Sequence, residues 1–175
     1  IGDGAPVRGD WGGIWINNGG TAILNHAVVR YGGGILTTSG LVKVYEGGNL
    51  TLTNSTLEYS ANYGVYVGGV EELSILNNTI RNCTEDGIHI DDSDTDTLPV
   101  SPEIRGNVIN NTRYPLNITA PDGYTGEYRI TDNTGTGNTY NYISMYSLLV
   151  GSVKLGTSNG FDWVFGNGVA IPAGA

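Results

Sequence analysis

Short segments with alternating apolar and polar residues recur along this chain, and no other feature limits its possible folds as strongly. A first series begins at intervals of 21 to 30 residues, at Gly13-Ile-Trp-Ile16, Gly34-Ile-Leu-Thr37, Gly64-Val-Tyr-Val67, Gly87-Ile-His-Ile90, Pro115-Leu-Asn-Ile118 and Tyr142-Ile-Ser-Met145. Two further series lie between its members. Three strands in each repeat of about 25 residues indicate a solenoid, in which a coil buries its apolar face only against its neighbours.

The repeat also predicts which side chains form the core. Equivalent positions of stacked coils lie one strand spacing apart, about 4.8 Å, so each series gives a column of inward residues. The expected columns are Ile14, Ile35, Val65, Ile88, Leu116 and Ile143 in the first sheet, Leu24, Leu52, Ile75, Ile104 and Ile130 in the second, and Val29, Leu57, Ile80 and Ile109 in the third. Because no apolar stripe of helical period persists, we predict an all-β, single-stranded parallel solenoid of about six to seven coils.

The turns support this register. One equivalent turn position is occupied by Ser55, Asn78, Asn107 and Asn133. A buried Asn can bond the backbone and also the amide of the next coil, so we expect an Asn ladder. Arg30, Glu58 and Arg81 should stack outside the third sheet, where opposite charges on adjacent strands attract.

The chain resembles the right-handed parallel β-helix repeat modules of secreted and cell-surface proteins, within the pectate-lyase-like superfamily. The residues that carry the resemblance are Gly9-Asp-Trp-Gly-Gly-Ile-Trp-Ile16, Leu24-Asn-His-Ala-Val-Val-Arg-Tyr-Gly-Gly33, Leu50-Thr-Leu-Thr-Asn-Ser-Thr-Leu57 and Leu73-Ser-Ile-Leu-Asn-Asn-Thr-Ile80. It covers residues 9 to 145. The superfamily includes polysaccharide lyases, glycoside hydrolases, epimerases, phage spikes and adhesins, so the resemblance implies a right-handed helix without implying one reaction.

Length and charge narrow the class of protein further. The 175 residues suit a single β-helix domain over 1–175, in which residues 146–175 form a last coil or a cap. Both ends look cut from a longer chain, so neighbouring modules of the same parent are expected partners. The net charge is −9 with only eight Lys and Arg, so nucleic acid is not an expected partner. No apolar stretch reaches 18 residues, so membrane insertion is not expected. Cys83 is the sole cysteine and should be buried.

A candidate binding face follows from the outward residues of the first series. This row reads Trp15, Leu36, Tyr66, His89, Asn117 and Ser144. Trp15 and Tyr66 could stack on sugar rings, while His89 and Asn117 could bond sugar hydroxyls. The alternative is that these outward aromatic residues only cover the sheet and favour strand formation.

Two other motifs carry weaker signals. Asp92, Asp94 and Asp96 resemble the start of a calcium loop but lack its Gly and bidentate Glu, so the choice is between a structural calcium site and a solvated turn. No other cofactor is expected. Asn54 and Asn77 begin Asn-x-Ser/Thr sequons at one shared turn position and are candidate glycosylation sites.

No catalytic pattern appears in the sequence. The acids near His89 crowd into one loop, whereas a glycosidase needs two facing carboxyl groups. We therefore expect a non-catalytic structural or adhesive module of an exported surface protein, which is secreted or held at the cell surface and binds polysaccharide or surface glycan. The alternatives are a polysaccharide lyase or glycoside hydrolase acting on acidic polysaccharide, and a self-assembling cell-envelope component whose coil ends stack on neighbours.

Overall fold

The computed structural model describes residues 4–34, 36–91, 102–119, 128–146 and 160–166. Within these ranges the chain forms strands and turns and no helix. The described residues therefore include no helix long and apolar enough to cross a membrane. The strands are β1 (Ile14–Ile16), β2 (Thr21–Asn25), β3 (Val28–Arg30), β4 (Gly40–Thr53), β5 (Thr56–Glu58), β6 (Tyr63–Leu76), β7 (Thr79–Arg81), β8 (Ile88–Asp91), β9 (Glu103–Arg105), β10 (Val108–Asn110), β11 (Leu116–Thr119), β12 (Arg129–Thr131), β13 (Tyr142–Tyr146) and β14 (Asp162–Phe165).

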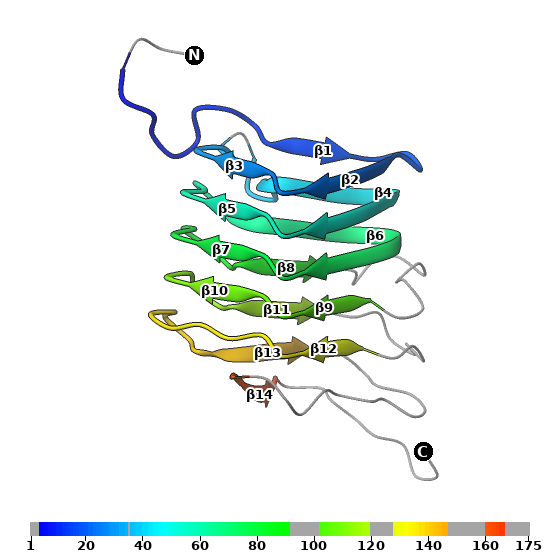
Figure 1. Ribbon diagram of the computed structural model, residues 1–175, viewed down its shortest axis with the longest axis vertical. Coiled ribbons are helices and arrows are strands. Elements are labelled where there is room, and N and C mark those ends of the chain that lie inside the picture. The colour runs from blue at the N-terminus through cyan, green and yellow to red at the C-terminus, as the bar shows by residue number, and fades with distance from the viewer. Residues whose placement is uncertain (1–3, 35, 92–101, 120–127, 147–159, 167–175) are drawn as a thin grey trace.

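The strands stack in parallel along three sides. The first sheet has the order β1-β4-β6-β8-β11-β13-β14. The second side joins β2, β4, β6, β9 and β12, because β4 and β6 are long enough to take part in both. The third sheet has the order β10-β7-β5-β3. Figure 1 shows the coils stacked from the N-terminal β1 downwards, which confirms the predicted all-β parallel solenoid.

The number of complete coils is smaller than predicted. Within the described ranges, four coils carry strands on all three sides, against the six to seven expected. In the next coil the third side is reduced to one parallel bridge between Val108 and Thr134. The prediction counted first-sheet segments, and this sheet continues further than the other two, through β13 and β14.

The second and third core columns agree with the prediction. Leu24, Leu52, Ile75, Ile104 and Ile130 are successive partners on the second side, and Val29, Leu57, Ile80 and Ile109 are partners in the third sheet. Ile75, Ile80 and Leu52 have no exposed surface. A register shift by one residue would have turned these side chains outward, so their burial verifies the register.

One member of the first predicted column is wrong. β4 begins at Gly40, and Val42 pairs with both Ile14 and Val65 in the place assigned to Ile35. Ile35 itself lies outside the described residues, and Leu36 is 51% exposed in a bend. Glycine followed by apolar residues occurs at both places, and strand pairing selects the later one, which continues directly into the second side of the coil.

The predicted Asn ladder is present. Asn78 Oδ1 accepts the Ser55 backbone N–H at 2.9 Å, and Asn78 Nδ2 donates to Leu52 O at 2.9 Å and to Asn107 Oδ1 at 3.0 Å. Asn107 repeats these contacts one coil further on with Ile75 and Asn133. The outward column of Arg30, Glu58 and Arg81 is also confirmed by its register.

Candidate functional site

The outer face of the first sheet carries one continuous row of side chains. Strand pairing places Trp15, Lys43, Tyr66, His89, Asn117 and Ser144 in this order along the solenoid. Trp15, Tyr66, His89 and Asn117 therefore lie on one face, as expected, whereas Leu36 is replaced by Lys43. With about 4.8 Å between strands, Trp15 and Asn117 are roughly 19 Å apart along the axis.

A cation lies among aromatic rings at the N-terminal end of the row. Lys43 Nζ is 4.5 Å from the ring centre of Tyr45, 5.1 Å from that of Tyr66 and 5.8 Å from that of Trp15. Burial lowers the pKa of Lys43, and the negative charge of Glu46 partly offsets this effect. Such contacts are cation–π interactions, which hold the ammonium group against the rings.

The two aromatic residues predicted to stack on sugars differ in exposure. Trp15 is 42% exposed, but Tyr66 is only 9% exposed. The Tyr66 ring stacks on His89 at 5.6 Å, and its hydroxyl group donates to Asp91 Oδ2 at 3.5 Å. Tyr66 therefore supports its neighbours, while Trp15 keeps surface open to a ligand.

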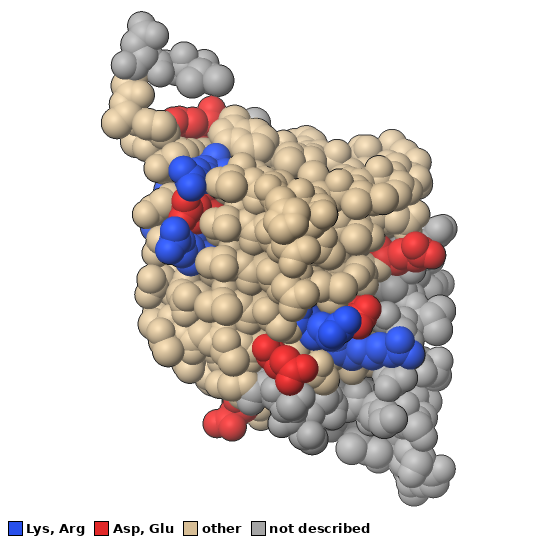
Figure 2. Space-filling model, in the orientation of Figure 1, with Lys and Arg blue, Asp and Glu red and all other residues tan. Residues whose placement is uncertain are grey.

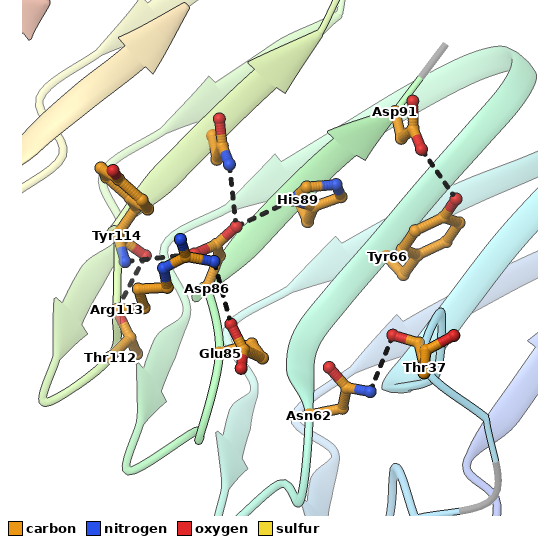
Figure 3. Close-up of polar contacts among 11 residues, drawn as sticks. Thr37, Asn62, Tyr66, Glu85, Asp86, His89, Asp91, Thr112, Arg113 and Tyr114 are labelled. Carbon is orange, nitrogen blue, oxygen red and sulfur yellow. Dashed lines mark hydrogen bonds and ion pairs between the residues drawn. The ribbon is translucent and has the colours of Figure 1, made fainter. Parts of the chain in front are cut away.

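A fully buried carboxylate organises the next part of the row. Asp86 precedes β8 and has no exposed surface. Its Oδ2 accepts from His89 Nδ1 at 2.8 Å and from Asn117 Nδ2 at 3.1 Å, and its Oδ1 accepts the Tyr114 backbone N–H at 3.3 Å (Figure 3). Because an ionised carboxylate only accepts hydrogen bonds, Asp86 fixes the orientation of both side chains. Asn117 Oδ1 is buried and has no hydrogen-bond partner among the described residues.

Charged and aromatic side chains border this cluster. Arg113 Nη1 donates to Glu85 Oε2 at 3.3 Å, and its guanidinium lies 5.4 Å from the ring centre of Tyr114. Burial acts to lower the pKa of Arg113, but Asp86 and Glu85 outweigh it and the pKa is raised. Burial, with a hydrogen bond to Tyr142, raises the pKa of Tyr114 to about 12. Tyr114 also stacks at 4.6 Å on Tyr140, which is 41% exposed.

The comparison with protein families agrees with this architecture. Residues 9–134 match the family model described as a right-handed β-helix region. The chain belongs to the right-handed β-helix family. No match was found among curated proteins or among solved structures. The right-handed β-helix is thus the shared feature, and any specific activity must be argued from the side chains on its surface.

The remaining predicted sites of this β-helix are the candidate calcium ligands and the candidate glycosylation sites. Asp92, Asp94 and Asp96 lie outside the described residues, and the described part contains no group of three His, Cys, Asp or Glu residues suited to a metal ion. Asn54 and Asn77 are both exposed at equivalent turns, with φ of 51° and 58°. Asn54 Nδ2 donates to Asn25 Oδ1 at 3.0 Å.

The arrangement of carboxyl groups on this β-helix bears on catalysis. On the strands beside β8, the positions next to His89 hold Tyr66 and Asn117, and Asp91 pairs with Thr119. Adjacent coils therefore place no carboxyl group at these positions, and both oxygens of Asp86 already accept hydrogen bonds. A glycosidase needs two carboxyl groups free to act on either side of a bond.

Sequence reasoning missed the place of Lys43 in the row and the contacts of Asp86. Asp86 is one of several acids near β8, and its neighbours in the sequence do not distinguish it from Glu85. Its partners Tyr114 and Asn117 lie 28 and 31 residues further along the chain. The one available signal was its spacing of three residues from His89, which places both on one side of the turn into β8.

Proposed function

We propose that this chain is a non-catalytic β-helix module of an exported surface protein, and that the outer face of its first sheet binds a polysaccharide chain. The observation that carries this proposal is the row of Trp15, Lys43, Tyr66, His89 and Asn117, one residue per coil. A linear polymer lying along the solenoid axis would meet a new side chain at each coil.

The chemistry of the row suits carbohydrate. Two exposed rings are available to a ligand: Trp15 in the first coil, and Tyr140, which precedes β13 and stacks on Tyr114. Between them, the buried Asp86 holds His89 and Asn117 in fixed orientations before any ligand arrives. Because these two side chains are already ordered, binding a ligand costs less conformational entropy. A small number of polar contacts is then enough for measurable affinity. No cofactor is needed for this role.

A polysaccharide lyase or hydrolase is the second candidate, and the Asp86–His89 pair is the observation in its favour. His89 Nδ1 bonds the carboxylate, and only 15% of its side chain is exposed. Such a pair can hold a histidine ready for proton transfer. The binding role is preferred because the strands beside His89 present Tyr66 and Asn117 instead of a second acid.

Affinity electrophoresis through gels that contain neutral or acidic polysaccharides tests the proposal. The wild-type chain should be retarded in at least one gel. Trp15→Ala and Tyr140→Ala should each weaken binding on the order of tenfold, since each removes roughly one ring's burial. Their melting temperatures should stay within about 2 °C of wild type, because both residues are surface-exposed.

The matched control is Ile23→Ala, which removes a 73% exposed apolar side chain from the second side of the solenoid. It should leave retardation unchanged. Equal retardation of the wild type and both ring variants would refute the proposed site. Release of reducing ends or unsaturated products from the bound polymer, lost in His89→Ala, would instead establish the enzyme.

A further inference from the structure

The turn after each third-sheet strand holds one residue in the left-handed region. These residues are Tyr31, Tyr59, Asn82 and Asn111, with φ of 61°, 61°, 56° and 53°. Asparagine adopts this conformation readily, whereas a bulky side chain there is a genuine outlier. In the third and fourth coils the two asparagines bond each other, Asn111 Nδ2 to Asn82 Oδ1 at 3.2 Å. The first two coils carry tyrosine at the same position.

Packing of the apolar core does not account for the two tyrosines. Both are half-buried, and their rings stack at 5.3 Å with an angle of 8°. Neither belongs to the buried apolar core. Strained backbone at a non-glycine residue persists where the surroundings retain it, and such positions concentrate at binding sites. The departure from the asparagine pattern of the later coils therefore indicates a function at this corner.

Two arginines flank the tyrosine stack. Glu58 is almost fully buried. Its Oε2 accepts a hydrogen bond from Arg81 Nε at 2.7 Å, and its Oε1 forms an ion pair with Arg30 Nε at 2.7 Å. The arginine side chains are 49% and 47% exposed. A guanidinium carries five N–H donors, and the contacts with Glu58 involve only the Nε group of each arginine. The other four donors of each arginine have no partner within the described part of the chain.

The local charge of this corner is opposite to that of the whole molecule. Arg30, Arg81 and Glu58 sum to +1. Arg8, which bonds Thr84 Oγ1 at 3.4 Å, and the neighbouring Asp10 carry opposite charges that cancel. Figure 2 shows blue side chains around a red one beside the strands of the third sheet. At physiological salt, charges beyond about 8 Å are largely screened, so a partner meets a positive surface here despite the net charge of −9.

We propose that Arg30, Tyr31, Tyr59 and Arg81 form an Arg–Tyr corner that docks an acidic segment of a partner protein. Guanidinium groups bind carboxylates through paired N–H donors. Tyrosine and arginine are among the residue types enriched at the centres of protein interfaces. This surface is separate from the first-sheet row.

Titration with acetylated hexaglutamate, followed by NMR of the arginine Nε–H groups, tests the docking surface. The Arg30 and Arg81 signals should shift on addition of the peptide, with at least fivefold weaker apparent affinity in the double variant Arg30→Gln/Arg81→Gln. Arg105→Gln is the matched control, because Arg105 Nε also donates to a glutamate, at 2.8 Å, and its side chain is 51% exposed, but it lies in β9 on the second side of the solenoid and not at the Tyr31–Tyr59 stack. That variant should bind as wild type does.

A second variant separates docking from folding. Tyr31→Asn/Tyr59→Asn introduces the residue that later coils use at this turn, so its melting temperature should equal or exceed that of wild type while hexaglutamate binding weakens at least threefold. A clear drop in melting temperature would make the tyrosines structural and overturn the proposal. Absence of Arg30 and Arg81 shifts would also overturn it, as would shifts with hexagalacturonate at equal or lower concentration, which would assign the corner to a glycan.

Discussion

At the scale of single residues, the Asn ladder shows how the interior accepts polar groups. Asn78, Asn107 and Asn133 are at most 2% exposed. Asn78 and Asn107 each accept a backbone N–H from the preceding coil and donate both to a backbone carbonyl and to the next amide of the ladder. A buried amide is tolerated when its donors and acceptor are satisfied, so the ladder links coils without leaving unpaired groups.

Asn78→Ala should lower the free energy of unfolding by about 1–3 kcal/mol, because the Ser55 N–H and Leu52 carbonyl lose their partner in the interior. Urea unfolding measures the loss. Asn25→Ala, at an exposed position of β2, should change stability by less than about 0.5 kcal/mol. Equal effects of the two substitutions would mean that the ladder contributes nothing beyond an ordinary surface amide.

Cys83 gives a pH dependence of stability. Burial raises its thiol pKa from 9.0 to about 12, against the smaller opposing effects of a Ser60 backbone hydrogen bond and of Arg8. Between these values the unfolded chain releases the proton and the folded chain keeps it, so the unfolded state binds fewer protons and stability falls as pH rises. The contribution is fully present below pH 9 and is lost at about 1.4 kcal/mol per pH unit above it.

Urea unfolding of wild type and Cys83→Ala at pH 8, 9.5 and 10.5 checks this dependence. The tyrosines titrate in both proteins, so the difference between the two curves isolates the thiol. The variant is expected to be less stable at pH 8, since it leaves a small cavity, but to lose less stability per pH unit above pH 9. Parallel curves would show that the thiol is accessible to solvent.

At the scale of elements, the long strands β4 and β6 hold two sides of the solenoid together. Their pairing runs from Gly40–Tyr63 to Thr53–Leu76, with register shifts near Gly48 where the strands pass from the first side to the second. Such irregularities bend a strand locally while pairing resumes beyond them. The inward columns of both sides are therefore kept in one register by a continuous backbone.

On the second side of the solenoid, an Ile→Ala substitution should cost much more stability on the inward face than on the outward face. Ile75→Ala should lower stability by about 2–5 kcal/mol, because Ile75 has no exposed surface and lies between Leu52 and Ile104. Ile23→Ala, on the outward face of β2, should change it by less than about 0.5 kcal/mol. Thermal and urea unfolding of both variants measure these losses. A larger loss for Ile23→Ala than for Ile75→Ala would mean that the assignment of inward and outward faces is wrong.

At the scale of the whole molecule, each coil completes the core of its neighbour. Ile14, Ala22 and Leu24 of the first coil are only partly buried, whereas Val42, Leu50 and Leu52, which occupy the same positions in the second coil, are at most 1% exposed. Stability in such an array is a sum of contacts between adjacent coils. The first-sheet row and the Arg–Tyr corner lie on different sides of this stack, so a substitution in one surface should leave binding at the other unchanged.

The sequence by itself determined the solenoid, two complete core columns, the Asn ladder and five of the six members of the outward row. All of these follow from a local pattern repeated at each coil, in which alternation decides the face of every residue. Tertiary structure decided between Ile35 and Val42, because each belongs to a short apolar run that begins with a glycine and only pairing with β1 and β6 separates them. It also decided the role of Asp86, since burial and hydrogen bonds to His89 and Asn117 exist only when adjacent coils stack.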